Sequence, residues 1–286
     1  MTLSVLQRTT MANNPPSRKR ATAVVLGCDR VGSAVAHALH RAGLAVVLVD
    51  AIDPPWCRRG MAYTNAWYLG SAELEGEAAC FCASLRSIPS ILSRRLIAAT
   101  TWSWSGIVAE LDAMAIIDAR LSGRAPNASL RGHVQHAVGV GDGFLAGIDV
   151  DLVIENASDH HESDAPAIEI PAGAARTALA VPDVGITSLR ADRDGRFFTS
   201  CRIGDAVRAG DVVGHLRAEP IVAPCDGVLC GLSARGARIV RGQTIVEVDP
   251  RGDPALCHGL SGEPVRIARR VVDALAMRGA IAAERY

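Results

Sequence analysis

Two similar stretches occur in the chain: GDAVRAGDVVGHL at residues 204–216 aligns with GARIVRGQTIVEV at residues 236–248. The turn block APCDGV (223–228) lies between them. Both copies follow the pattern Gly-x-x-(Val/Ile)-x-x-Gly-x-x-(Val/Ile). Glycine at such turns supplies a positive φ, and the alternating Val, Ile and Leu residues form the inward face of short strands. The repeat therefore predicts two interlocked strand-and-turn units in a small all-β domain.

This repeat resembles the barrel-sandwich hammerhead of biotinyl and lipoyl domains. A carrier domain of that type needs a lysine at the tip of its hairpin, where residues 216–222 read LRAEPIV. The only lysine of the chain is Lys19, near the N-terminus. An arginine in its place is not acylated, because the guanidinium stays protonated. The sequence therefore excludes biotin and lipoate as carried groups.

Composition narrows the classes of partner. With 286 residues and a net charge of zero, the chain has the length of about two domains and no general affinity for nucleic acid or an anionic membrane. No apolar run reaches the roughly 18 residues of a membrane span, and segment 1–20 lacks the apolar core of a signal peptide. Met1 and Met11 are both candidate starts. Eight cysteines without a secretion signal favour reduced thiols in the cytoplasm, and the sequence leaves open whether the chain forms a homo-oligomer.

The N-terminal half has the pattern of an α/β domain. AVVLG (23–27) and AVVLVD (45–50) are strand-like apolar runs on either side of an alanine-rich helix predicted over 33–42, which makes a βαβ unit. Later apolar runs, as far as 151–155, extend the same parallel sheet. We therefore predict a disordered tail (1–20), a Rossmann-like domain (21–188), a barrel-sandwich domain (189–252) and a C-terminal helical segment (253–286).

The turn GCDRVG, from Gly27 to Gly32, resembles the dinucleotide-binding fingerprint. The second glycine of that fingerprint is replaced by Asp29, whose carboxylate would repel a pyrophosphate. Asp50, at the end of the second predicted strand, stands where a ribose-binding acid is expected. The pattern thus favours a Rossmann-like fold, while Asp29 disfavours NAD(P). A turn that binds no dinucleotide remains the alternative.

Two longer blocks resemble accessory proteins of selenium-dependent molybdenum hydroxylases. RRGMAYTNAWYLG (58–70) is similar to the family block RRxVSFxxAVYxG, and GVGDGFLAGIDVD (139–151) is similar to GLGPGFxAGxDVD. That family is related to the xanthine and carbon monoxide dehydrogenase accessory factors. The resemblance implies a maturation factor that holds or hands over a molybdopterin-type cofactor for a client molybdenum hydroxylase.

The resemblance also suggests which residues face the cofactor. Arg58 and Arg59 follow the second strand, at the carboxyl edge of the sheet, where paired guanidiniums would clamp phosphate and pterin oxygens. The alternative is a pair of surface arginines in an arginine-rich chain. Three alternate glycines after residue 138 would let backbone amides line an anion nest, although Asp142 replaces the family's proline between them. The full candidate set is Gly27, Gly32, Asp50, Arg58, Arg59, Gly139, Gly141 and Gly143.

Other reactive side chains give weaker hypotheses. His160, which matches a family histidine, and His161 lie among acidic residues and are candidate metal ligands; the alternative is a solvated cluster on a loop. Cys28 and Cys225 are candidates for a sulfur relay, and a helix N-terminus would depress the pKa of Cys28. The alternative is that both thiols are buried and inert.

No catalytic residue can be assigned from spacing alone, so the sequence does not say whether the protein is an enzyme. Two functions of other classes stay open. One is an NAD(P)-dependent oxidoreductase, and the other is a noncatalytic scaffold whose small domain docks a partner enzyme.

Overall fold

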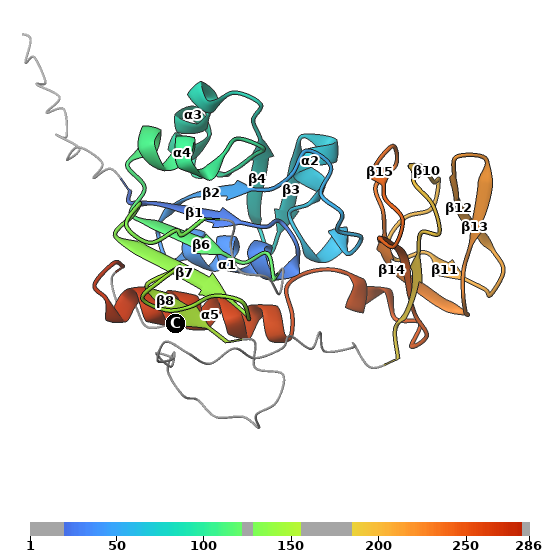
Figure 1. Cartoon of the computed structure of the whole chain (residues 1–286). Coiled ribbons are helices and arrows are strands. Elements are labelled where there is room, and N and C mark those ends of the chain that lie inside the picture. The colour runs from blue at the N-terminus through green and yellow to red at the C-terminus, as the bar shows by residue number, and fades with distance from the viewer. Residues whose placement is uncertain (1–19, 122–127, 156–184, 282–286) are drawn as a thin grey trace, which may run out of the picture.

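The computed structural model describes residues 20–121, 128–155 and 185–281. It contains one eight-stranded sheet and two four-stranded antiparallel sheets, which confirms the mixed α/β class (Figure 1). The predicted tail 1–20 and the predicted boundary region after residue 155 fall almost wholly outside the described residues, as do His160 and His161.

The large sheet has the strand order β3-β4-β5-β2-β1-β6-β7-β8. All of its neighbouring strands are parallel except the pair β3 and β4, which is antiparallel. Its central strands read as uninterrupted apolar runs because helices cover both faces. The strands are β1 (Thr22–Leu26), β2 (Ala45–Val49), β3 (Ser71–Leu74), β4 (Glu77–Phe81), β5 (Ile97–Thr100), β6 (Ala115–Asp118), β7 (His136–Val140) and β8 (Leu152–Ile154).

Helices form a layer on each face of this sheet (Figure 1). The core on one face includes residues of α1 and α5, and the core on the other includes residues of α3 and α4. Short helical segments fill the connections. The helices are α1 (Arg30–Arg41), α2 (Asn65–Leu69), α3 (Ile88–Ser93), α4 (Trp104–Leu111) and α5 (Glu263–Met277), and the 3-10 turns are η1 (Arg59–Met61), η2 (Leu85–Ser87) and η3 (Pro254–Cys257).

The start of α1 differs from the sequence prediction. We placed the first helical residue at Ser33, but α1 begins at Arg30, because the side chain of Asp29 accepts a hydrogen bond from the backbone N–H of Gly32 and caps the helix. At the other end Gly43 has a φ of 92° just after the helix, a conformation that favours glycine. The prediction missed the cap because Asp29 had been interpreted only as a defect in a phosphate-binding turn.

The repeat unit folds as two interlocked copies. Each copy is a two-residue strand, a turn and a longer strand, and the two copies exchange sheets: β11 and β16 belong to one sheet, and β12 and β15 to the other. The sheet orders are β13-β12-β10-β15 and β11-β14-β16-β9. The strands are β9 (Thr187–Arg190), β10 (Gly195–Phe198), β11 (Ala206–Val207), β12 (Val212–Leu216), β13 (Glu219–Val222), β14 (Gly227–Leu232), β15 (Arg238–Ile239) and β16 (Thr244–Asp249).

The glycines of the repeat are left-handed, as predicted. Gly204 and Gly236 have φ values of 96° and 84°, and Gly210 and Gly242 have values of 88° and 85°. Most of the Val, Ile and Leu residues of the repeat belong to the core that the two sheets share, whereas Val212 and Val240 are exposed. The hairpin between β12 and β13 turns at residues 217–218, Arg-Ala, so its tip carries no lysine.

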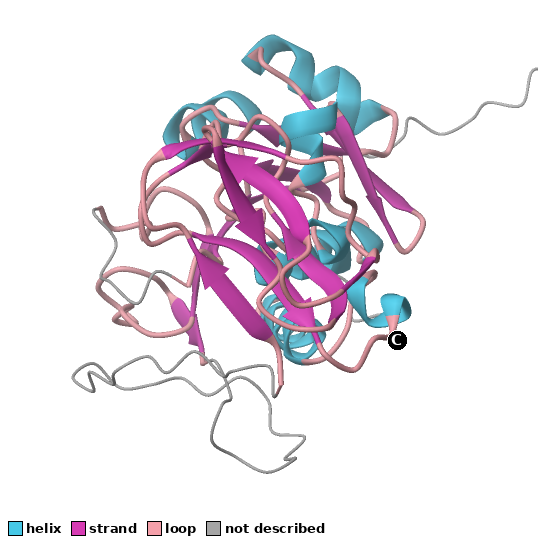
Figure 2. Ribbon diagram, turned by 90° about the vertical axis from the view of Figure 1, so that its right-hand side faces the viewer, coloured by secondary structure: helices cyan, strands magenta, loops and turns pink. Residues whose placement is uncertain are grey.

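This antiparallel module, residues 187–249, packs beside the carboxyl-side loops of the large sheet, and Figure 2 shows it from its own side. The backbone N–H of Leu232 donates to the carbonyl of Cys57 over 2.9 Å, which joins β14 to the loop after β2. After the module the chain returns through η3 to α5, which packs against α1. Residues distant in sequence therefore meet at one junction between the module and the large sheet.

Candidate functional site

The turn after β1 is shaped by two glycines. Gly27 has a φ of 99°, and a Cβ placed on Gly32 would lie only 1.9 Å from the carbonyl oxygen of Gly27. Helix α1 can approach the turn this closely only without a side chain at position 32. Both predicted glycines are therefore needed by the local fold, whether or not the turn receives a ligand.

The backbone amides of this turn are bound by the protein's own carboxylates. Asp29 accepts from the N–H of Gly32 over 2.8 Å, and Asp50 accepts from the N–H of Cys28 over 2.7 Å. The same oxygen of Asp50 also accepts from the indole N–H of Trp56 over 2.9 Å. An incoming phosphate would have to displace these carboxylates from the N–H groups that usually bind it.

Burial raises the pKa values of two side chains in this turn, Asp29 and Cys28. Burial raises the pKa of Asp29 from 3.8 to about 6, although the hydrogen bond from Gly32 opposes the rise. Burial and the neighbouring Asp50 raise the pKa of Cys28 well above its usual value. The prediction of a depressed pKa at Cys28 was therefore wrong, because desolvation and negative charge outweigh the helix N-terminus.

Arg120 covers the same turn from the next strand of the sheet. Its Nε and Nη2 donate to the two carboxylate oxygens of Asp118 over 2.8 and 2.5 Å, and this pairing raises the pKa of Arg120. Its Cγ would lie 3.2 Å from a Cβ on Gly27. The space beside β1 and β6, at the carboxyl edge of the sheet, is thus occupied by a side chain that already has an ionic partner.

The second glycine block divides between a strand and a turn. Gly139 lies within β7 rather than in the predicted turn, and a Cβ there would lie 2.4 Å from Cγ of Phe144. Gly141 and Gly143 have φ values of 81° and 96° and form the turn itself. The N–H of Gly141 donates to the carbonyl of Ile154 over 2.8 Å. Ring packing therefore accounts for Gly139, and turn geometry accounts for the other two glycines.

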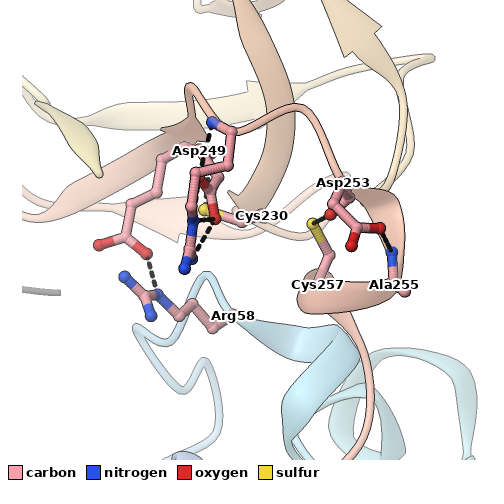
Figure 3. A network of polar contacts seen from close by, with 8 residues as sticks. Arg58, Cys230, Asp249, Asp253, Ala255 and Cys257 are labelled. Atoms are coloured by element: carbon pink, nitrogen blue, oxygen red, sulfur yellow. Dashed lines mark hydrogen bonds and ion pairs between the residues drawn. The ribbon is translucent and has the colours of Figure 1, made fainter. Parts of the chain in front are cut away.

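Arg58 connects the large sheet to the antiparallel module. Its Nε lies 2.6 Å from a carboxylate oxygen of Glu247 on β16, and the two side chains are 15% and 14% exposed. Glu247 also accepts from the hydroxyl of Ser188 on β9. Figure 3 shows Arg58 reaching from the loop after β2 toward the strands of the module. In this structure the first arginine of the pair makes an interdomain ion pair.

Arg59 instead lines a cavity of about 360 Å³ at the same junction. The wall of this junction cavity comes from the η1–α2 region, from β3, from the turn before β11 and from the segment after η3. Its lining residues are Arg59, Gly60, Ala62, Asn65, Leu69, Ser71, Ala72, Glu73, Cys201, Arg202, Ile203 and His258. The volume falls in the range of small-molecule sites, and such sites are common between domains.

The Arg59 side chain is held by hydrogen bonds on two sides. Its Nε donates to the carbonyl of Leu232 over 2.8 Å, and its Nη1 donates to the side-chain oxygen of Asn65. Burial lowers the pKa of Arg59 from its ordinary value, yet a guanidinium remains charged at neutral pH. A fixed, partly desolvated positive charge therefore lies at the cavity wall.

The imidazole of His258 lies close to two glycines. A Cβ on Gly60 would lie 3.1 Å from Cδ2 of His258, and a Cβ on Gly204 would lie 3.3 Å from Cε1. The same Cβ on Gly60 would lie 2.4 Å from the carbonyl oxygen of Cys257, so only glycine fits there. Gly60, the third residue of the RRG block, thus lets the C-terminal segment approach the η1 turn.

Sequence reasoning found Arg59 but missed Arg202 and His258, which also line the cavity. Arg202 precedes the first repeat glycine, and His258 follows the module by a few residues. Neither belongs to a motif of its own, since their shared position depends on how the module docks. The local signal that could have indicated Arg202 is its position, two residues before the first glycine of the repeat, Gly204.

The described residues contain no group of three or more His, Cys, Asp and Glu side chains placed to hold a metal ion. All eight cysteines are free, and Cys28 is buried while Cys225 is partly buried. Of the helices within the described ranges, none combines the length and apolar character needed to cross a bilayer.

Comparisons with known proteins give one sequence relative. No protein-family model matches the chain. The chain is 28% identical over 260 residues to the uncharacterized protein YqeB of Escherichia coli (strain K12), an alignment that covers 89% of this chain and 47% of that protein. The chain therefore spans about half the length of this relative.

Solved structures give only distant similarities. The ectoine utilization protein EutE (DoeB) from Ruegeria pomeroyi matches with a TM-score of 0.21 and 12% identity, over 80% of this chain and 52% of that one. A succinylglutamate desuccinylase/aspartoacylase from Rhodobacter sphaeroides matches with a TM-score of 0.19 and 13% identity, over 79% and 51%. Scores this low carry no inference about fold or activity.

Proposed function

We propose that this protein is a cytoplasmic accessory factor in the maturation of a molybdenum hydroxylase, and that it holds a molybdopterin-type cofactor before transfer to that client. The observation that carries the proposal is the position of Arg59. This arginine belongs to the block that resembles the accessory family, and its guanidinium lines the junction cavity. A phosphorylated, oxygen-rich pterin is the kind of ligand that a fixed guanidinium recognises.

The finer fold supports this proposal. Without the β3–β4 hairpin, the large sheet has its strands in the chain order 3-2-1-4-5-6, which is the order of the Rossmann fold. The interlocked repeat of the antiparallel module resembles that of a biotinyl/lipoyl-like barrel-sandwich, and its hairpin tip carries no lysine. A module of this kind, unable to carry a covalent group, is suited to form one wall of a binding site.

The turn after β1 favours this reading over an NAD(P)-dependent oxidoreductase. Its amides are bound by Asp29 and Asp50, and Arg120 occupies the space at the switch in strand order. A dinucleotide would have to displace two carboxylates and an ion-paired arginine. We therefore place the ligand at the junction cavity and leave the turn after β1 without one.

The test is to purify the protein from a molybdenum-replete host and to measure oxidised pterin fluorescence and total molybdenum per chain. We expect close to one pterin per chain, and a strong reduction in Arg59→Gln. Circular dichroism must show that this variant is folded, and Arg193→Gln, an exposed change in the module, is the matched control. Pterin-free protein that still captures a molybdenum hydroxylase would instead support the scaffold function.

The dinucleotide alternative is tested on the same preparation. Calorimetric titration with NAD and NADP should give no binding heat. Saturable binding of either nucleotide, lost in variants of the turn after β1, would overturn the proposed function in favour of an oxidoreductase.

A further inference from the structure

We infer that the junction cavity is divided into a phosphate subsite and a ring-edge subsite. Arg59, Arg202 and His258 receive a phosphate monoester, and Glu73 receives the N–H groups of an amino-oxo pyrimidine edge. Pterins and guanine share this edge. The inference rests on the proposed function, because it assigns roles within the same cavity, and it adds residues that neither the sequence motifs nor the resemblance contained.

Arg202 supplies the second guanidinium from the antiparallel module. Its backbone is fixed in a tight turn, since its N–H donates to the carboxylate of Asp205 over 2.8 Å and its carbonyl accepts from the N–H of Asp205 over 3.1 Å. Its side chain is exposed and makes no hydrogen bond or ion pair with another residue in the described part of the chain. An anchored backbone with an uncommitted guanidinium at a cavity wall is suited to an anionic ligand.

His258 completes the phosphate subsite. Its Nδ1 lies 3.2 Å from the carbonyl oxygen of Pro254, which requires the proton of the neutral ring on Nδ1. Nε2 is then left for a ligand. It accepts a hydrogen bond from a singly protonated phosphate, and in the imidazolium form it donates to the dianion. The hydrogen bond to Pro254 and the closeness of Gly60 and Gly204 limit the orientation of the ring.

Glu73 gives the cavity its second subsite. It is an exposed residue on β3 and supplies the one carboxylate among the lining residues, which also include two arginines and a histidine. A carboxylate repels phosphate but pairs with two adjacent N–H donors, which an amino-oxo pyrimidine presents and adenine does not. The guanidiniums of Arg59 and Arg202 thus favour the phosphate, and the carboxylate of Glu73 favours a ring with two adjacent N–H groups.

Arg202 joins Arg59 and His258 in one cavity only when the module is docked. Arg59 follows β2, Arg202 precedes β11, and His258 follows η3. The carbonyl of Gly60 accepts a hydrogen bond from the N–H of Gly259 over 3.1 Å, which joins the η1 turn to the segment after η3. The site thus requires the whole chain, so the experiment uses the full-length protein.

The first experiment measures binding of guanosine 5′-monophosphate, guanosine and adenosine 5′-monophosphate by calorimetry. We expect GMP to bind at least about tenfold more tightly than either of the other two, since each lacks one of the two recognised groups. Arg202→Gln should weaken GMP binding about tenfold or more and leave guanosine unchanged. Arg208→Gln, an exposed arginine in the same module, should match the wild type. Equal GMP affinity in Arg202→Gln and wild type would overturn the phosphate subsite.

The second experiment tests the ring edge. Glu73→Gln should reduce the preference for GMP over AMP about tenfold, and Glu219→Gln, on an exposed strand, should leave it unchanged. An unaltered preference in Glu73→Gln refutes the ring-edge subsite. Because the Glu73 side chain is exposed, this variant is expected to fold, and its unfolding midpoint checks that directly.

A third experiment decides whether the ring is a pterin or a guanine. It measures binding of oxidised molybdopterin, both with its phosphate and after phosphatase treatment. Tighter binding of the phosphorylated pterin than of GMP supports a pterin ligand. GMP binding without pterin binding would keep the two subsites but contradict the proposed function. If pterin binds and neither Arg202→Gln nor Glu73→Gln changes its affinity, the proposed function is supported and the two subsites are refuted. Failure of all three ligands to bind would overturn both.

Discussion

The ion pair between Arg58 and Glu247 should hold the antiparallel module against the large sheet. Replacing Glu247 with alanine removes a carboxylate that lies 2.6 Å from Nε of Arg58. The two side chains are 15% and 14% exposed, so both are mostly buried. Removing one partner of a fully buried pair costs about 3–5 kcal/mol, whereas an exposed pair contributes about 0–1 kcal/mol. Because this pair is mostly buried, we expect Glu247→Ala to lower the free energy of unfolding by about 2–3 kcal/mol.

The assay is equilibrium unfolding in urea, followed by far-ultraviolet circular dichroism and by tryptophan fluorescence. The four tryptophans, at positions 56, 67, 102 and 104, all lie in the large-sheet part of the chain, so fluorescence reports that part alone. A loss of this size corresponds to a midpoint shift on the order of 1 M urea. If the pair couples the two parts, the circular dichroism transition of the variant should also begin before the fluorescence transition.

A double-mutant cycle with Arg58→Ala isolates the pairwise contribution. We expect a coupling energy of about 1.5 kcal/mol or more. The pair of Arg269 and Asp273 on α5, with side chains 77% and 56% exposed, is the control, and its coupling should stay near about 0.3–0.5 kcal/mol. A coupling for Arg58 and Glu247 no larger than that of the α5 pair would refute the argument that this contact orders the junction.

Two further predictions concern the turn after β1 and the second glycine block. Asp29→Asn keeps the hydrogen-bond acceptor for the helix but removes a carboxyl whose folded pKa of about 6 exceeds its ordinary 3.8, so ionisation of the wild-type group opposes folding. The wild-type carboxyl contributes its full stability below about pH 4, and this contribution is lost as the pH rises through 6. Asp29→Asn should therefore stabilise the protein by up to about 3 kcal/mol at pH 8 and have no effect near pH 4. If the free energies of unfolding of variant and wild type differ by the same amount at both pH values, the burial argument is contradicted. Gly139→Ala should lower the free energy of unfolding by about 1–3 kcal/mol, because its Cβ would lie 2.4 Å from the ring of Phe144. Thermal unfolding measures this, with Gly106→Ala on α4 as a control expected to be neutral or stabilising, and an unchanged midpoint for Gly139→Ala would refute the packing role.

The repeat shows how much of this fold a sequence pattern can predict. Residues 204–216 and 236–248 repeat at one spacing, and in both copies the two glycines of the shared pattern have positive φ while most of the apolar residues enter a shared core. The prediction succeeded because turn chemistry and a period of two are local properties. The same is true of β1 and β2, whose apolar runs place them in the middle of the large sheet.

The candidate site was less accessible to sequence reasoning because it depends on contacts between distant segments. Nothing near Arg58 and Arg59 indicates that one would ion-pair with Glu247 and that the other would line a cavity. Those roles follow from the docking of a module that begins more than a hundred residues later. Sequence reasoning also treated Asp29 as an obstacle to phosphate, whereas its position makes it a helix cap.

The two carboxylates at the turn after β1 and the charges at the junction form one consistent arrangement. An α/β sheet of this strand order normally offers its ligand the N–H groups at the start of the first helix. Here Asp29 and Asp50 already accept hydrogen bonds from those groups, so a phosphate gains little there and meets two negative charges. At the junction cavity Arg59 is fixed and charged, and Arg202 of the module adds a second guanidinium from outside the sheet. A phosphorylated ligand should therefore bind where the second module completes the site, which makes docking of that module a condition for binding.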